Sequence, residues 1–422
     1  MKKYDILYSS VKSMIESGEL KSGDKLLSVR KASEQYGVSV TTVSNAYFAL
    51  CADGYIISKE KSGYTVSAKA MFNTVQAPQE NRKKIYYDLS GNGADAQSFD
   101  VKLWQRYVKN ALRQKERLLS YSEPQGEYDL RCAISDYIRK RRNVIASPER
   151  IVIGAGVQPL LYILSSLLKS SEKSNSISFP DESFALGRAV FKTAGYNVHT
   201  RDKTADVIYV SPSHMTRFGD VMPIKRRLEL VRYSAENFKT VIEDDYESEL
   251  LYNVRPTPSL YALGHKNIVY IGSFSAMLLP GIRISFMVLT DALFEAFKQN
   301  EFKYAQTASK TEQIALCGFI REGHISAQIR KARRIYAYKT KVFAEILKEK
   351  LPALNITIGE NSLQIRVECD FSGSAGDFLK TGIKVFCEKR ENGRCVLMLS
   401  PSAVPQEKLC DAADKLLKVL ER

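Results

Sequence analysis

The sequence predicts a two-domain α/β protein, in which a small helical module precedes a large domain built on a mostly parallel sheet. The first observation is length, because 422 residues exceed what one ordinary core accommodates. The second is that residues 4–68 combine short amphipathic helices with a β-hairpin pattern. The third is that, from residue 86 onward, short runs rich in Val and Ile alternate with amphipathic stretches. That alternation is typical of a parallel sheet covered by helices on both faces.

Composition narrows the class of protein. Hydrophobic residues make up 44% and charged residues 26%, as in a soluble globular protein. No apolar run approaches the roughly 18 residues of a membrane span, and the N-terminus is amphipathic rather than a signal peptide. Seven scattered cysteines without a C-x-x-C pair, and four dispersed histidines, argue against disulfides and metal sites and favour the cytoplasm. The net charge of +15 favours nucleic acid as a partner, with solubility alone as the alternative.

The N-terminal helices follow from their apolar spacing. The first helix is predicted over 4–18, and its apolar stripe consists of Leu7, Val11, Met14 and Ile15. A second helix is predicted over 28–36 and stops at Gly37. Ser39 can cap a third helix, whose buried face is predicted to consist of Val43, Ala46, Tyr47 and Leu50. Two helices joined by a tight turn, the second beginning with small polar residues, are typical of a helix-turn-helix.

The stretch "GYIISKEKSGYTVSA" then predicts a hairpin with a basic tip, which is a wing. Together these residues resemble the winged helix-turn-helix of the GntR family, whose motifs appear as "GELKSGDKLLSVR", "VSVTTV" and "KSGYTV". The resemblance covers 4–68, which predicts a DNA-binding domain over 1–69, and it implies that double-stranded DNA is bound. It implies that DNA is faced by Arg30, Ser39, Thr41, Thr42, Lys61 and Gly63. Val40 and Ser44 stand where arginine is frequent and Leu27 replaces proline, which leaves the operator open.

Residues 70–85 are polar and aperiodic, which predicts a linker. In the large domain, strands are predicted at "RIVIGAG", "SISFPD", "DVIYVSPS", "TVIEDDY", "NIVYIGSF" and "ISFMVL". Ligands of such sheets bind beyond the carboxyl ends of the strands, so we expect the residues there to meet at one pocket.

The chemistry at these strand ends suits a phosphorylated pyridine. The helix start at Gly156, Val157 and Gln158 offers backbone N–H groups to a phosphate. Hydroxyls and a charge would come from Ser273, Ser275 and Arg283. Asp244 could pair with a pyridine nitrogen, and Phe184 could stack on the ring. Each feature alone is common in proteins, and only their order and spacing together favour a site.

Residues 86–422 resemble a fold-type I aminotransferase domain, and the whole chain resembles a MocR-type regulator. The resemblance rests on "YSEPQGEYDLR", "GAGVQPLL", "SPSH", "IEDDYESEL", "YIGSFS", "LLPGIRIS" and "REGHISAQIRKARRIY". It implies that Asp244 pairs with the pyridine nitrogen of pyridoxal phosphate, and that Tyr246 and His214 lie near the ring. It assigns the phosphate to Ser273, Ser275 and Arg283.

One position departs from that family. The residue after "GSFS" is normally the lysine that forms the Schiff base to pyridoxal phosphate, and here it is Ala276. A methyl group can neither attack the cofactor nor carry a proton, so transamination is not expected. The change is either an engineered replacement in an intact site or natural loss. Natural loss is favoured, because Met215, Arg217 and the Leu397–Met398 pair also depart from the family, the last where an arginine binds the substrate carboxylate.

The sequence therefore predicts a transcription regulator whose aminotransferase-like domain senses a small molecule without turnover. The expected effector is non-covalent pyridoxal phosphate or an amino-acid-like compound. The resemblance also implies a head-to-tail homodimer with no membrane partner. The alternatives are a working pyridoxal enzyme with an appended DNA-binding module, and a purely structural dimerisation domain.

Overall fold

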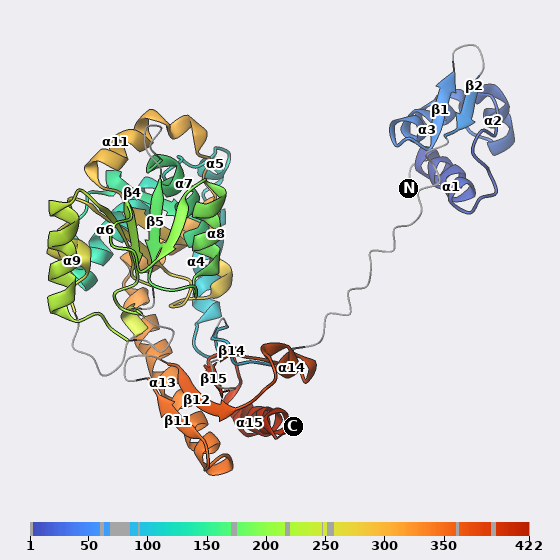
Figure 1. Ribbon diagram of the computed structural model, residues 1–422. Coiled ribbons are helices and arrows are strands. Elements are labelled where there is room, and N and C mark those ends of the chain that lie inside the picture. Colours follow the sequence, from blue (N-terminus) through green and yellow to red (C-terminus); the bar gives the residue numbers. More distant parts are fainter. Residues whose placement is uncertain are drawn as a thin grey trace. The chain divides into compact units, whose positions relative to one another are not determined.

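The computed structural model describes residues 3–59, 63–67, 85–91, 93–169, 175–215, 220–246, 248–250, 257–359, 363–389 and 394–421. The chain divides into two compact units, Met1–Arg82 and Lys83–Arg422 (Figure 1). Lys61 of the predicted wing and, apart from Ile85, the whole predicted linker lie outside the described residues. None of the described helices is both long enough and apolar enough to cross a bilayer.

The described residues of the first unit form three helices and a two-stranded antiparallel hairpin. Its elements are α1 (Lys3–Glu16), α2 (Val29–Tyr36), α3 (Val40–Ala52), β1 (Ile56–Lys59) and β2 (Gly63–Val66). The four residues predicted for the inner face of α3 are all buried, and they pack with Leu7, Val11 and Ile15 of α1. The unit therefore has the form of a helix-turn-helix followed by a β-hairpin.

Local signals set the short turn between α2 and α3. Gly37 adopts the left-handed conformation (φ 60°), and its N–H points back to the carbonyls of Ser33 and Glu34. Ser39 then accepts a hydrogen bond from the backbone N–H of Thr42 at 3.1 Å. Helix α2 is thus capped at its C-terminus and α3 begins after three residues, so the start of α3 is fixed by local hydrogen bonds.

The second unit is built on a seven-stranded sheet in the order β4-β10-β9-β8-β7-β5-β6. Six of the strands coincide with the predicted runs, and β6 was not predicted. The strands are β4 (Ile151–Gly154), β5 (Ser176–Phe179), β6 (Asn197–Thr200), β7 (Val207–Val210), β8 (Thr240–Asp244), β9 (Ile268–Ser273) and β10 (Ser285–Val288). β10 is antiparallel to β4 and β9, and the pairings from β9 to β6 are parallel, so the sheet is mostly parallel.

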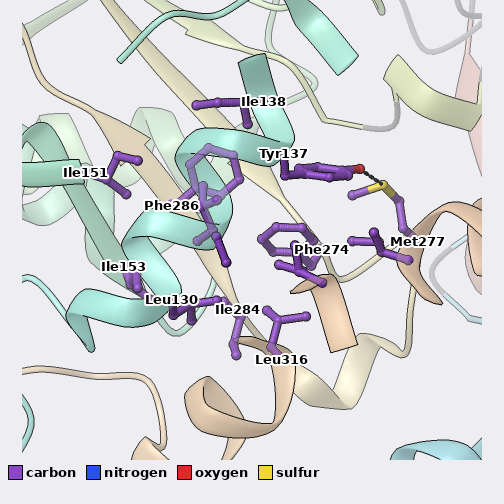
Figure 2. Packing of buried hydrophobic residues seen from close by; sticks show 14 of the residues in the cluster. Leu130, Tyr137, Ile138, Ile151, Ile153, Phe274, Met277, Ile284, Phe286 and Leu316 are labelled. Atoms are coloured by element: carbon purple, nitrogen blue, oxygen red, sulfur yellow. Dashed lines mark hydrogen bonds between the residues drawn. The ribbon is translucent and has the colours of Figure 1, made fainter. Parts of the chain in front are cut away.

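Helices cover both faces of this sheet, as the alternation of apolar residues requires. Ile151 and Ile153 of β4 belong to the core shared with α6 (Tyr128–Arg142) and α12 (Lys310–Arg321). Figure 2 shows Phe274 and Met277, from the segment after β9, in this same cluster. The opposite face packs against α7 (Val157–Leu167) and α8 (Ala185–Thr193). The remaining helices up to residue 350 are α4 (Val101–Leu112), α5 (Lys115–Leu118), α9 (Ile224–Glu236), α10 (Leu260–Leu263), α11 (Asp291–Gln299) and α13 (His324–Lys350).

The C-terminal part has its own sheet and core. Its four strands are antiparallel, in the order β11-β12-β15-β14. The 27-residue helix α13 reaches this part, since Phe343, Ala344 and Leu347 belong to its core. The elements are β11 (Asn355–Ile358), β12 (Ile365–Asp370), α14 (Ala375–Lys380), β14 (Phe386–Lys389), β15 (Arg394–Leu399) and α15 (Leu409–Leu420), with β3 (Tyr87–Asp88) parallel to β13 (Ile383–Lys384).

Candidate functional site

The start of α3 presents the residues predicted to face DNA. Ser39 and Thr41 are exposed, and so is Arg30 at the start of α2. Thr42 is half-buried, and its hydroxyl lies 2.8 Å from that of Ser39, so it takes part in the cap. Gly63 begins β2 with φ 86°, a conformation that favours glycine, and it is exposed. The described residues thus form a polar, accessible start of helix α3.

In the second unit, strand register brings three of the predicted strand ends to one edge of the sheet. Ser285, the first residue of β10, pairs with Gly154 on one side and with Ser273 on the other. On the next strand, Asp244 pairs with Ile271 of β9. The predicted glycine turn, serines and carboxylate therefore share one edge, where ligands of such sheets bind.

Arg283 lies directly against the glycine turn before α7. A β-carbon at Gly156 would be 2.6 Å from Nη2 of Arg283, so the guanidinium group fills the space left by the missing side chain. Arg283 itself has a positive φ of 50°, which is uncommon outside glycine and is found at functional sites. The guanidinium thus stands beside the first turn of α7, where Val157 and Gln158 contribute N–H groups without partners in their own helix.

Asp244 is buried at the end of β8. Its Oδ2 accepts a hydrogen bond from the hydroxyl of Tyr209, while Oδ1 has no partner among the described residues. Burial raises the pKa of Asp244 to about 6, although the Tyr209 hydrogen bond lowers it. The ring of Phe184 stacks on Tyr209, with centroids 5.2 Å apart. Phe184 and Asp244 are therefore connected through Tyr209, a residue that the sequence reasoning did not single out.

Both carboxylate oxygens of the neighbouring residue, Asp245, already have partners. It forms an ion pair with Arg142 at 2.7 Å and accepts hydrogen bonds from Ser213 and from Tyr270. Glu243, on the other side, is also buried and accepts two backbone N–H groups from the start of α10. Of three consecutive acids, Asp244 alone has an oxygen left for a ligand.

His214 and Tyr246 form a stacked pair with ring centroids 4.9 Å apart. Burial lowers the pKa of His214 to about 4, so its imidazole is neutral at pH 7. Tyr246 follows Asp244 by two residues, and the predicted pair is thus brought together beside the end of β8.

The serines are also close together. Ser273 Oγ accepts hydrogen bonds from Ser285 Oγ at 2.9 Å and from the backbone N–H of Ser275 at 3.3 Å. The hydroxyl of Ser275 is buried and has no partner within the part of the chain that the structure describes. Like Asp244, Ser275 keeps an unused polar atom at the sheet edge, which suits a polar ligand.

Ala276 follows this serine and is half-buried. Its methyl group packs against a small apolar cluster that contains Leu250, Ala332 and Tyr336, the last two on α13. Leu397 and Met398 of β15 are both buried. Apolar side chains thus occupy the positions where the family resemblance implied a lysine and an arginine.

A helix-turn-helix joined to an aminotransferase-like α/β domain defines a class of protein: a DNA-binding transcription regulator. The family described as "Bacterial regulatory proteins, gntR family" matches residues 3–66, and "Aminotransferase class I and II" matches residues 89–370. The chain belongs to the regulators that join these two domains.

Individual relatives agree with this assignment. The uncharacterized HTH-type transcriptional regulator YdeL of Bacillus subtilis is 32% identical over 85% of this chain and 82% of its own length. The probable rhizopine catabolism regulatory protein MocR of Rhizobium meliloti is 28% identical over 88% of this chain and 82% of its own. An archaeal alanine:glyoxylate aminotransferase superposes with a TM-score of 0.70 at 18% identity, over 80% of this chain and 91% of its own, which shows the shared fold.

Proposed function

We propose that this regulator binds pyridoxal phosphate, or an amino-acid-like effector, in its aminotransferase-like domain without a covalent bond and without turnover. Occupancy of the site at the sheet edge then changes how the N-terminal domain binds DNA. The N-terminal domain comprises residues 1–69, joined by a linker over 70–85 to the sensing and dimerising domain at 86–422. The protein would exist in two arrangements that differ in DNA affinity. A ligand shifts the equilibrium between them only if it binds one arrangement more tightly than the other.

The residues at the sheet edge fit pyridoxal phosphate. Arg283, Ser273, Ser275 and the N–H groups of Val157 and Gln158 would hold its phosphate, with Gly156 leaving room for the guanidinium. Asp244 would accept the N–H of the protonated ring through its unpartnered Oδ1. Phe184, or the His214–Tyr246 pair, would flank the ring. When bound, this group supplies an electron-withdrawing ring and an aldehyde.

Catalysis needs an amine in this chain that reacts with that aldehyde and moves protons. Position 276 provides a methyl group packed among apolar side chains, which can do neither. This favours a sensor over a pyridoxal enzyme with an appended DNA-binding module.

The unpartnered Oδ1 of Asp244 is the single observation that carries the proposal. Burial of a carboxylate oxygen without a partner is costly, and a purely structural domain would gain nothing from it. In a ligand-binding domain, the same oxygen would accept a hydrogen bond from an N–H group of the ligand.

Self-association is the remaining part of the proposal. Leu119 and Tyr121, two residues apart on the chain, are 88% and 101% exposed. Large apolar side chains left so open support a head-to-tail homodimer that covers them.

Equilibrium dialysis of the full chain against pyridoxal phosphate tests the proposal. We expect saturable binding that is fully released on denaturation, and much weaker binding by the Asp244→Asn variant. Cofactor that stays attached after borohydride treatment and denaturation would contradict non-covalent binding. Amino-group transfer to a keto acid that persists in purified protein would contradict the absence of turnover.

A further inference from the structure

A cleft lies in the large unit, outside the site at the sheet edge. It has a volume of about 550 Å³, within the roughly 300–1,000 Å³ of small-molecule sites. Three walls form it: the segment 94–97, one side of α13, and the turn 403–407. Its lining residues are Ala94, Asp95, Ala96, Gln97, Arg334, Ile335, Tyr338, Lys339, Ala403, Pro405, Gln406 and Glu407.

The buried side chain of Lys339 forms hydrogen bonds that connect the three walls of the cleft. Lys339 of α13 donates to Asp95 Oδ2 at 2.6 Å and to the carbonyl of Ser402 at 2.8 Å, and only 1% of it is exposed. The Ser402 hydroxyl also donates to the carbonyl of Gly93 at 2.9 Å. The floor of the cleft is therefore held in place before any ligand arrives, which reduces the entropy that binding would cost.

The rim of the cleft carries two opposite charges, on Arg334 and Glu407. Arg334 and Glu407 are both exposed, and neither forms an ion pair with a residue that the structure describes. Lys339 pairs with Asp95 and also interacts electrostatically with Glu407, so the four charged groups of the cleft sum to zero and Arg334 is its available cation. A phosphate would meet two carboxylates and one available cation, whereas a molecule with both charges would satisfy both rim groups.

Apolar groups line much of the rest. Ala94, Ala96, Ala403, Pro405 and Ile335 contribute carbon surface, and the ring of Tyr338 is 52% exposed beside them. The amide of Gln406 donates to the Tyr338 hydroxyl at 3.4 Å and steadies the ring. The cleft thus offers an apolar surface next to a separated pair of charges.

We propose that this cleft binds a small apolar zwitterion of the amino-acid type, with its carboxylate on Arg334 and its ammonium on Glu407. It is a ligand site additional to the one in the proposed function. Ile335 connects the two regions, because it lines this cleft and also packs in the cluster that contains Ala276. A ligand here would lie between the segment 94–97 and α13.

Calorimetric titration of the full chain without pyridoxal phosphate tests this. The probes are L-phenylalanine, phenethylamine, which lacks the carboxylate, and 3-phenylpropionate, which lacks the amine. We expect L-phenylalanine to bind at least about tenfold more tightly than either, because each loses one charge-assisted contact. No measurable L-phenylalanine binding, or equal affinity for all three, would overturn the proposal.

Variants locate the bound probe. Arg334→Gln and Glu407→Gln should each weaken L-phenylalanine binding about tenfold, while Arg330→Gln, an exposed arginine of α13 outside the cleft, should not. Thermal unfolding should stay cooperative in all three, since these side chains are exposed. If L-phenylalanine bound both rim variants as tightly as the wild-type protein, its site would lie elsewhere and the proposal would be wrong. The proposed function also allows an amino-acid-like effector at the sheet edge, and the rim variants distinguish the two sites, because only binding in this cleft depends on Arg334 and Glu407.

Discussion

The guanidinium group of Arg283 occupies the space that a side chain at residue 156 would need. The separation between Nη2 and a β-carbon at Gly156 would be 2.6 Å, far inside van der Waals contact. Gly156 also has φ 91° and ψ 179°, a region that in practice only glycine enters. The glycine thus serves both the turn into α7 and the approach of the arginine.

Gly156→Ala should therefore strain the turn into α7 and displace the guanidinium group of Arg283. We expect a loss of about 1–3 kcal/mol of unfolding free energy from backbone strain, together with loss of pyridoxal phosphate binding as Arg283 is displaced. Gly281→Ala is the matched control, because a β-carbon there meets nothing within 4 Å. Urea unfolding and dialysis measure the two effects. Equal behaviour of the two variants would show that the Gly156–Arg283 contact does not matter.

Asp244→Asn should stabilise the ligand-free protein while weakening pyridoxal phosphate binding. Burial raises the pKa of Asp244 from 3.8 to about 6, so ionisation of this carboxyl penalises the folded state increasingly from pH 3.8 upward and fully above pH 6. The gap corresponds to about 3 kcal/mol, fully present at pH 8 and lost as the pH falls from about 6 through 3.8, below which the group is neutral in both states.

Urea unfolding at pH 8 and pH 4 measures this difference. Asp245→Asn is the contrasting control, since it breaks the buried pair with Arg142 and should cost about 3 kcal/mol. If Asp244→Asn destabilised the chain at pH 8, Asp244 would be a structural residue and not a reserved ligand contact.

At the start of α3, stability and DNA binding should respond separately to changes at Ser39. Ser39→Ala removes the acceptor for the Thr42 N–H and should lower stability by about 1 kcal/mol. Ser39→Asp keeps a cap, so stability should be retained, but it adds a negative charge to the surface expected to face DNA. Fluorescence anisotropy with the duplex upstream of the chain's own gene should show weaker binding for Ser39→Asp. Unchanged affinity would place DNA on another surface.

Ala276→Lys should convert reversible binding into a covalent attachment. The family resemblance puts the Schiff-base lysine at this position, so an amine introduced there should reach the aldehyde of a bound cofactor. Mass spectrometry after borohydride reduction should show one cofactor mass on the peptide that contains residue 276. Ala276→Met is the control for side-chain length. The absence of an adduct in a folded Ala276→Lys protein would mean that the aldehyde is not held near this position.

Sequence patterns predicted most of the central sheet. Six strands were visible because their Val and Ile runs are buried on both faces. The edge strand β6 was missed, since Asn197, His199 and Thr200 are exposed and give no apolar signal. The reversed direction of β10 was also invisible, because a buried strand reads the same in either direction. The direction of β10 is determined by the strands it pairs with, not by its local sequence.

The acids "EDD" at 243–245 show where site prediction from sequence ends. Adjacent carboxylates look equivalent, yet Glu243 binds backbone N–H groups, Asp245 pairs with Arg142, and Asp244 keeps one oxygen unpartnered. Tyr209, which holds Asp244, lies inside an ordinary buried strand and carries no motif. Long-range contacts assign these roles, and they are not encoded in local spacing.

The most direct test is the affinity of the full chain for its promoter duplex, titrated with pyridoxal phosphate at constant salt. Couplings between two sites are typically about fivefold or more. We predict a saturable change of that size in the wild-type protein and none in Asp244→Asn. An affinity that stays constant at all pyridoxal phosphate concentrations, in a wild-type protein shown to bind DNA, would contradict the account.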